Sequence, residues 1–409
     1  MINTIVESTS NRISISDIVQ DPVLTLLILS PFFDALTGWL ILSGIMSEGF
    51  LGSPSQLFRG CVFLLVLSRI ATSDTSAFLG LLTVTVSLLV LECISFIALH
   101  RSLIGYFIGL TNILRISFFY SLLIWSKYTV LKYRLSYAQL ERAIVFSGLV
   151  YASVVLLSLV LDVGFRTYGP GTGGSKGFFA SGNALSVTLG CVSLVALYSA
   201  KRRRQTKAWI EYAVILLALV AVGTKGSIGF FGANLVLIGK RYAWISFPAI
   251  LVLVGYFLSN NLIGKLFDVI LSRFENRESL LTFFVSGRDN YLKNALVIAE
   301  LNDHPGAVLF GRGALMSFRP VYTNDLLFDT LESDPVDIFF MYGLAGLTVY
   351  LLFVLRTITK FHGRIELQTA IVLFLGYSMV AGHSLFNQMA AGVFACIHAL
   401  GMVLNMENE

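Results

Sequence analysis

The chain has 409 residues, of which 56% are hydrophobic and only 13% are charged. Because a soluble globular protein carries roughly 25% charged residues, this composition excludes an ordinary soluble domain and places most of the chain in lipid. The formal net charge of +5 does not by itself indicate an orientation. The orientation depends on how the basic residues are distributed between the two sides of the membrane. All four cysteines fall inside apolar runs without paired or metal-ligand spacing, which indicates buried apolar thiols: Cys61, Cys93, Cys191 and Cys396.

The predicted elements are apolar runs long enough to cross a membrane. A hydrocarbon core of ~30 Å requires about 20 apolar residues in a helix. We therefore expect an all-α polytopic membrane protein with about twelve transmembrane helices, and no cleavable signal peptide. The expected spans are residues 22–46, 56–73, 77–99, 103–126, 137–163, 183–200, 208–223, 227–240, 243–263, 336–356, 366–385 and 388–405.

One long polar interval divides the chain into three predicted domains. Residues 1–263 form a membrane domain of about nine spans, residues 264–335 a loop domain outside the lipid, and residues 336–409 a second membrane domain of about three spans. Within the interval, Ser286-Gly287-Arg288-Asp289 opens an amphipathic run at helical spacing, which His304-Pro305-Gly306 is expected to stop. The loop domain is therefore predicted to be helical.

The orientation follows from the distribution of basic residues. With the N-terminus inside, the inner loops are rich in basic residues, whereas the short outer loops hold only Arg59, Arg101, Arg166, Lys176 and Lys225. Because basic residues favour the cytoplasmic side, both termini are predicted to be cytoplasmic and residues 264–335 to lie outside. Arg115 lies in the middle of the fourth run, where its charge indicates either a structural pair or a functional path.

Basic residues precede two of the spans that run inward from the outer side. Arg166 and Lys176 precede the sixth span, which Ser181 or Asn183 can cap, and Lys225 precedes the eighth span. A helix N-terminus presents free N–H groups and positive potential, so a neighbouring cation completes an anion site. Several such sites at one surface would suit a pyrophosphate. The alternative for each residue is a solvated side chain or one that contacts lipid headgroups.

A third site of this kind is predicted in the loop domain. Arg288 stands in the first turn of the amphipathic run, with Ser286 as its cap and Asp289 at the third helical position. Arg312, in the turn Gly311-Arg312-Gly313, is added to the candidate pyrophosphate ligands. The sequence contains neither a nucleotide-binding loop on this side nor a cluster with metal-ligand spacing, so we expect a reaction without metal or cofactor.

Three residues are candidates for the general base: Glu332, Asp334 and His383. A carboxylate or imidazole can accept the proton of an attacking sugar hydroxyl. Asp334 has a structural alternative, because Asp-Pro followed by Asp337 is a good start for the tenth span. His383 has another, as an interfacial histidine that packs its ring. Glu332 has no such structural role, and its alternative is an ordinary exposed glutamate; it is the preferred base.

Six short motifs carry a resemblance to a known family. They are Gly177–Asn183, Thr224–Ser227, Ser286–Arg288, Phe310–Gly313, the Glu332–Gly346 start of a span, and Ala381–His383. In their order and shared outer location, the chain resembles the O-antigen and capsule polymerase/O-antigen ligase superfamily of bacterial envelopes. The resemblance implies a GT-C-like glycosyltransferase in the bacterial inner membrane, with its large loop in the periplasm.

The resemblance also implies the substrates. The donor would be an oligosaccharide on undecaprenyl pyrophosphate; the acceptor would be a second lipid-linked repeat in the polymerase branch, and lipid A core in the ligase branch. Family ligases use two arginines and a histidine in outer loops. Here Arg288 fits one arginine, Lys225 replaces the other, and Glu332 and Asp334 stand where a ligase histidine is expected, which favours an inverting polymerase.

The expected partners are these lipid-linked sugars, membrane lipids and a chain-length regulator protein, without nucleic acid. A flippase of lipid-linked sugars is the alternative from another class. A flippase would more often carry charge inside its spans, whereas this sequence concentrates charge on one outer side.

Overall fold

The computed structural model describes residues 21–47, 52–98, 103–131, 137–168, 174–239, 292–293, 295–297, 305–313, 331–360, 364–380 and 387–408. The helices are α2 (Pro22–Leu42), α3 (Pro54–Ser73), α4 (Thr75–Ala98), α5 (Leu103–Leu131), α6 (Tyr137–Val160), α7 (Gly182–Arg203), α8 (Thr206–Val222), α9 (Lys225–Ile238), α14 (Pro305–Phe310), α15 (Asp334–Lys360), α16 (Ile365–Val380) and α17 (Gln388–Asn408). Two short strands, β1 (Phe165–Arg166) and β2 (Ser175–Gly177), pair antiparallel between α6 and α7.

This architecture confirms the prediction of an all-α polytopic membrane protein. Eleven of the twelve predicted spans coincide with helices, and the ninth, 243–263, lies outside the described residues. Among the described residues, seven helices are long and apolar enough to cross a membrane, namely α2 to α7 and α15. Shorter apolar helices are α9, α16 and the first part of α17. Most of the predicted loop domain, 264–335, lies outside the described residues.

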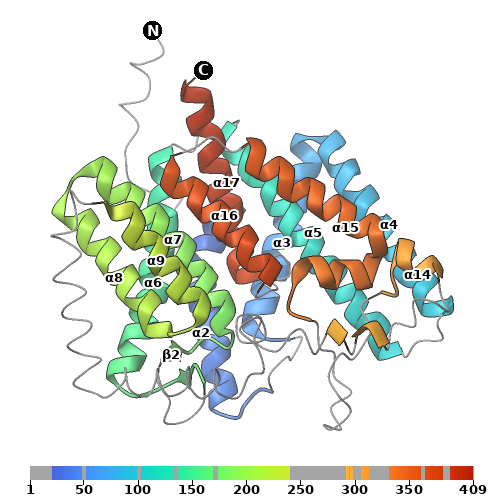
Figure 1. Ribbon diagram of the computed structural model, residues 1–409, viewed down its shortest axis with the longest axis horizontal. Helices are drawn as coiled ribbons and strands as arrows, with labels where there is room; N and C mark the ends of the chain where they lie inside the picture. Colours follow the sequence, from blue (N-terminus) through green and yellow to red (C-terminus); the bar gives the residue numbers. More distant parts are fainter. Residues whose placement is uncertain are drawn as a thin grey trace.

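Helix α7 is the centre of the bundle. It is almost entirely buried and packs against α6, α8, α9, α16 and α17 (Figure 1). Its hydroxyl groups bond neighbouring helices: Ser193 Oγ lies 2.8 Å from Asn234 Nδ2 of α9, and Ser199 Oγ lies 2.6 Å from Glu141 Oε1 of α6. Small and hydroxyl-bearing residues let helices approach closely in lipid, where apolar side chains alone give little preference for another helix.

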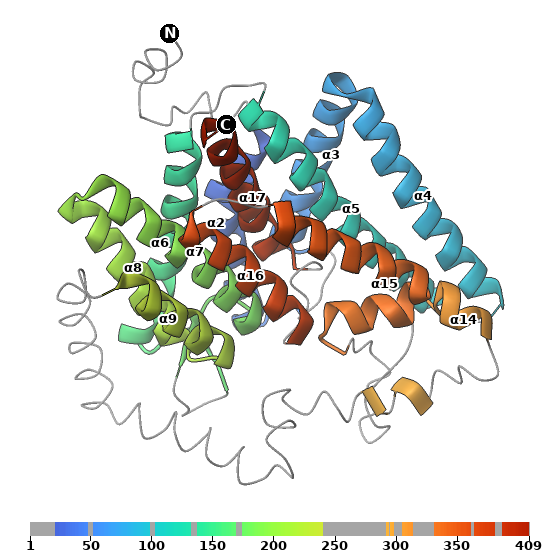
Figure 2. The ribbon, with the colours of Figure 1, turned by 45° about the horizontal axis from the view of Figure 1, so that its top comes forward.

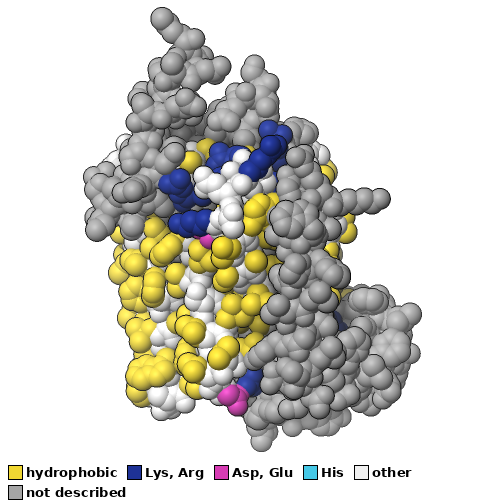
Figure 3. Space-filling view, turned by 90° about the vertical axis from the view of Figure 1, so that its left-hand side faces the viewer, with side chains coloured by type: hydrophobic (Ala, Val, Ile, Leu, Met, Phe, Trp, Pro, Cys, Tyr) yellow, Lys and Arg dark blue, Asp and Glu magenta, His cyan; other side chains and the backbone are white. Residues whose placement is uncertain are grey.

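The bundle has two chemically different ends. At the basic end, Arg202 and Arg203 of α7 bind the buried Glu141 at 2.7 and 2.6 Å, and Lys201 binds Glu366 of α16 at 2.8 Å. Figure 3 shows Lys and Arg side chains gathered at this end, above a band of apolar side chains. The opposite end, named here the hairpin end, carries β1 and β2. The side of the membrane that each end faces stays a prediction.

Two arginines lie inside membrane helices, and one of them was predicted elsewhere. Arg59 was expected in a short outer loop, but it lies inside α3, because this helix already begins at Pro54. Its guanidinium is buried against Asp34 of α2. Arg115 lies in α5 as predicted, partly buried, with its Nη1 3.3 Å from Asn112 Oδ1.

Candidate active site

The hairpin covers the ends of α6 and α8. Thr167, directly after β1, donates from its Oγ1 to the carbonyl of Val222 at the end of α8, at 2.6 Å. Arg166 forms an ion pair with Asp162, whose side chain is 80% exposed. Because this partner is well solvated, Arg166 is held at the rim of the hairpin end by a weak pair that a stronger anion could replace.

Lys176 of β2 lies against the start of α7. Its Nζ is 3.0 Å from the carbonyl oxygen of Ala180 and 5.4 Å from the centroid of the Phe165 ring. A β-carbon at Gly182, the first residue of α7, would lie 3.1 Å from Lys176 Cδ. Of the two predicted caps of this helix, Ser181 is the one used, since its Oγ accepts from the N–H of Ala184 at 3.2 Å. Lys176 is therefore fixed beside a helix N-terminus.

The start of α9 adjoins the start of α7. Thr224 caps α9 by accepting from the N–H of Ser227 at 3.0 Å, and its Oγ1 lies 2.6 Å from Ser186 Oγ of α7. Lys225 is the first residue of α9. A β-carbon at Gly226 would lie 2.2 Å from Tyr377 Cε2, so α9 also begins in close contact with α16. Two helix N-termini, with Lys176 and Lys225, thus lie together at the hairpin end.

The start of α15 is built around a buried carboxylate. Asp337 is fully buried and accepts from the backbone N–H groups of Leu331 and Ser333 at 2.7 and 3.2 Å. Asp334 is also fully buried, and Ser378 of α16 donates a hydrogen bond to its carboxylate. The predicted start of the tenth span is therefore present, with Asp337 reaching back to the N–H groups before the helix.

Glu332 lies in the turn that Asp337 holds. Its backbone has a φ of 53°, in the left-handed region that non-glycine residues rarely adopt. Leu331 and Ser333, on either side of it, are both buried, whereas Glu332 is partly exposed. An unfavourable backbone conformation of this kind persists only where the surroundings enforce it, and such residues cluster at functional sites. Glu332 is therefore a partly exposed carboxylate in an otherwise buried segment.

Arg312 lies at a break in α15. Gly343 has φ 65° and ψ −163°, which interrupts this helix and frees carbonyl groups. The N–H groups of Arg312 and Gly313 donate to the carbonyls of Phe340 and Met341 at 2.8 and 2.9 Å. Figure 2 shows α14 beside the bend between the two parts of α15. The Gly-Arg-Gly turn thus satisfies the backbone groups that the broken helix exposes.

Helix α16 connects the lysines to the acidic turn. Tyr377 packs against the start of α9, and the next residue, Ser378, bonds Asp334 of α15. The structure therefore places Lys176 and Lys225 on one side of α16, and Glu332 and Asp334 on the other. Arg166 lies on the adjoining hairpin, and Arg312 lies beside the break in α15, further from the turn. Arg288 and His383 lie outside the described residues.

One polar cluster inside the bundle was not predicted from the sequence. Arg59 Nη2 lies 2.6 and 2.7 Å from the two carboxylate oxygens of Asp34, which also accept from Tyr151 and Ser30 at 3.1 and 3.2 Å. Asp34 is the single acidic residue of an apolar run, and such residues usually have a partner in the bundle. That signal could have predicted a partner for Asp34, although not which one.

The hairpin end therefore offers two chemical functions. Adjacent helix N-termini with two lysines provide positive potential for a phosphate-bearing group. The Glu332 carboxylate can accept a proton from a hydroxyl group. Among the described residues, no group of three His, Cys, Asp or Glu side chains could hold a metal ion.

Comparison with known proteins yields one match. Residues 17–247 match the family described as O-antigen ligase like membrane protein. The match covers more than half of the 409 residues, from before α2 to beyond α9, and includes the hairpin and the starts of α7 and α9. No curated protein and no solved structure matches the chain.

Proposed function

The chain belongs to the O-antigen ligase-like family of membrane proteins, and from this premise we propose that it polymerises lipid-linked oligosaccharide repeats. The family connects the chain with polysaccharide assembly and with glycosyltransferase-type chemistry. The proposed donor is an oligosaccharide on undecaprenyl pyrophosphate, and the proposed acceptor is a second lipid-linked repeat. The proposed location is the bacterial inner membrane, with the hairpin end toward the periplasm and both termini in the cytoplasm.

The proposal rests on the arrangement around α16. Two helix N-termini with lysines lie on one side of this helix, and the acidic turn before α15 lies on the other. The donor pyrophosphate carries two or three negative charges and becomes more negative as the sugar leaves. The starts of α7 and α9, with Lys176 and Lys225, would stabilise that developing charge, which is commonly a large catalytic contribution. Arg288 and Arg312, from the predicted loop domain, would bind the same group from the other side.

The structure favours Glu332 over Asp334 as the base. Asp334 is fully buried and bonded to Ser378, and the neighbouring Asp337 holds the turn, so both carboxylates have structural partners within the bundle. Glu332 is partly exposed beside them. Its carboxylate would take the proton of the acceptor hydroxyl late in the reaction.

The proposed step is a single displacement. The acceptor oxygen forms a bond to the anomeric carbon while the bond from that carbon to the pyrophosphate oxygen breaks. The proton of the hydroxyl passes to Glu332, and undecaprenyl pyrophosphate leaves with the bonding electrons. Attack opposite the leaving group inverts the anomeric centre, so no covalent sugar–enzyme intermediate forms.

A ligase is the second candidate within the family. It would differ in its acceptor, lipid A core, and in its base, for which His383 is the candidate. The acidic turn before α15, where the resemblance to ligases would place a histidine, favours the polymerase. The match to this family gives no support to a flippase.

The experiment is complementation of a strain that lacks the gene, with the surface polysaccharide separated on a gel. The wild-type chain should restore long chains, and Lys225→Ala should shift them toward short ones. Arg69→Ala, which removes an exposed cation from α3 far from the hairpin end, is the matched control and should leave the distribution unchanged. Equal distributions for both variants would contradict a role for the α9 N-terminus.

A further inference from the structure

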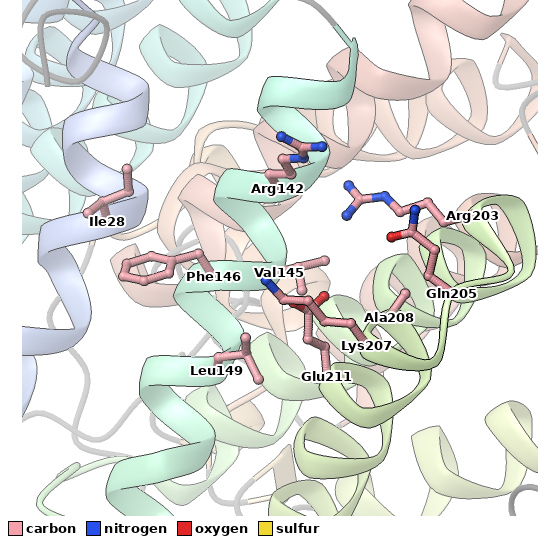
Figure 4. A pocket seen from close by; sticks show the side chains of 10 residues that line it. All are labelled: Ile28, Arg142, Val145, Phe146, Leu149, Arg203, Gln205, Lys207, Ala208 and Glu211. Carbon is pink, nitrogen blue, oxygen red and sulfur yellow. The ribbon is translucent and has the colours of Figure 1, made fainter. Parts of the chain in front are cut away.

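A groove of about 630 Å³ opens between α6 and α8 at the basic end of the bundle, far from the candidate active site. Its mouth is formed by Arg142 of α6, Arg203 of α7 and Lys207 of α8. Figure 4 shows the guanidinium groups of Arg142 and Arg203 facing each other across this mouth. Phe146 and Leu149, further along α6 from the cations, also line it.

The three cations of the mouth differ in whether an acidic residue pairs with them. Arg203 binds the buried Glu141 at 2.6 Å, and Lys207 lies 3.9 Å from Glu211. Arg142 forms no hydrogen bond or ion pair with any residue that the structure describes, although it is only partly exposed. A guanidinium at the end of a membrane helix, facing a second guanidinium, is stabilised by an anion between them.

The apolar part of the groove suits a hydrocarbon chain. Val145 and Ala208 are buried in its wall, and Phe146, which also lines the groove, is 46% exposed. From Arg142 to Leu149 the helix rises about 10 Å, so the apolar wall begins directly beneath the cations and continues toward the membrane interior. In Figure 3 the dark-blue side chains stand above an apolar band on this face.

We propose that this groove binds an anionic glycerophospholipid. The phosphate would lie between Arg142 and Arg203, with Lys207 beside it, and one acyl chain would lie against Phe146 and Leu149. Basic pockets between transmembrane helices recognise anionic headgroups in this way. A zwitterionic headgroup would bring its own ammonium to a mouth that already carries excess positive charge, and should bind less well. This site is independent of the proposed polymerase activity.

Native mass spectrometry of the purified full chain tests the headgroup. We expect phosphatidylglycerol to bind at least about tenfold more tightly than phosphatidylcholine with the same acyl chains, as one charge-assisted contact implies. Arg142→Gln should abolish this preference, and Lys207→Gln, at an exposed position, should weaken it. Arg356→Gln, at an exposed position on α15 outside the groove, should retain it. Equal binding of the two lipids, or an unchanged preference in Arg142→Gln, would overturn the proposal.

A second comparison tests the acyl chain. Leu149→Trp should fill the groove and weaken phosphatidylglycerol binding several-fold, whereas Leu157→Trp, on the same helix at a 60% exposed position, should not. Glycerophosphoglycerol, the headgroup without acyl chains, should compete poorly. If it competes as well as the intact lipid, the groove is an anion site alone and the proposal is wrong.

Discussion

Replacing Asp337 by asparagine tests the role of the turn before α15. We predict that Asp337→Asn slows elongation. The Asp337 carboxylate accepts the N–H groups of Leu331 and Ser333, at 2.7 and 3.2 Å, on either side of Glu332. An asparagine has one acceptor oxygen, so one of these buried N–H groups would face an amide NH₂ instead. The substitution changes few atoms and leaves Glu332 itself intact.

The expected magnitude follows from this lost bond. Leaving a buried N–H group without an acceptor costs about 1–3 kcal/mol. If that energy holds Glu332 in its left-handed conformation, its loss lowers the population of the productive turn. Because about 1.4 kcal/mol corresponds to a factor of ten, we expect the elongation rate to fall by about 10- to 100-fold.

The assay is elongation of a lipid-linked repeat by purified protein in proteoliposomes, with thermal stability measured in parallel. Thr129→Val is the matched control, since it removes one buried hydrogen bond to a carboxylate, from Thr129 Oγ1 to Asp21 at 2.7 Å, on helices away from the turn. It should elongate at close to the wild-type rate. The reasoning is refuted if Asp337→Asn elongates normally, or if both variants are slowed equally.

Four further predictions concern Glu332, Arg288, Gly343 and the membrane topology. Glu332→Gln should reduce turnover by about 10²–10⁴-fold while donor binding stays near wild type, and normal turnover would exclude it as the base. Arg288→Ala should remain folded in the membrane yet make no long chains, and Arg288→Lys should replace the bidentate guanidinium poorly; normal polymer from the alanine variant would contradict its role. Gly343→Ala places a β-carbon 2.3 Å from the backbone of α14 at a φ of 65°, so its melting temperature should fall by a few degrees, and an unchanged value would mean that the break is not needed. Cysteines at Asn302 and Gln205 should label from the outside and the inside respectively, and the reverse pattern would invert the topology.

The helices could be predicted from the sequence because a span leaves a local signal. Each run of about 20 apolar residues satisfies its own backbone hydrogen bonds in lipid, whatever its neighbours are. Local chemistry also predicted a cap at Ser181 or Asn183, and the structure selects Ser181. The same reasoning anticipated the acidic start of α15, where Asp337 reaches back to the preceding turn.

The unpredicted features depend on contacts between distant segments. In the sequence, Gly343 is one small residue in an apolar run. Its role as a helix break is visible only in the structure, where Arg312 and Gly313 donate to the freed carbonyls. The burial of Arg59 within the bundle was not predicted because its partner, Asp34, lies on another helix. The proximity of Lys225 to the acidic turn arises through Tyr377 and Ser378 of α16, far away in sequence, so it required the structure.

The most direct test of the central claim is the product formed by the purified chain in proteoliposomes supplied with one lipid-linked repeat and no lipid A core. We predict a ladder of lengthened lipid-linked chains, with one undecaprenyl pyrophosphate released for each repeat added. The Glu332→Gln variant should leave the repeat unextended. The account is contradicted if the wild-type chain lengthens nothing until lipid A core is added, because that result identifies a ligase.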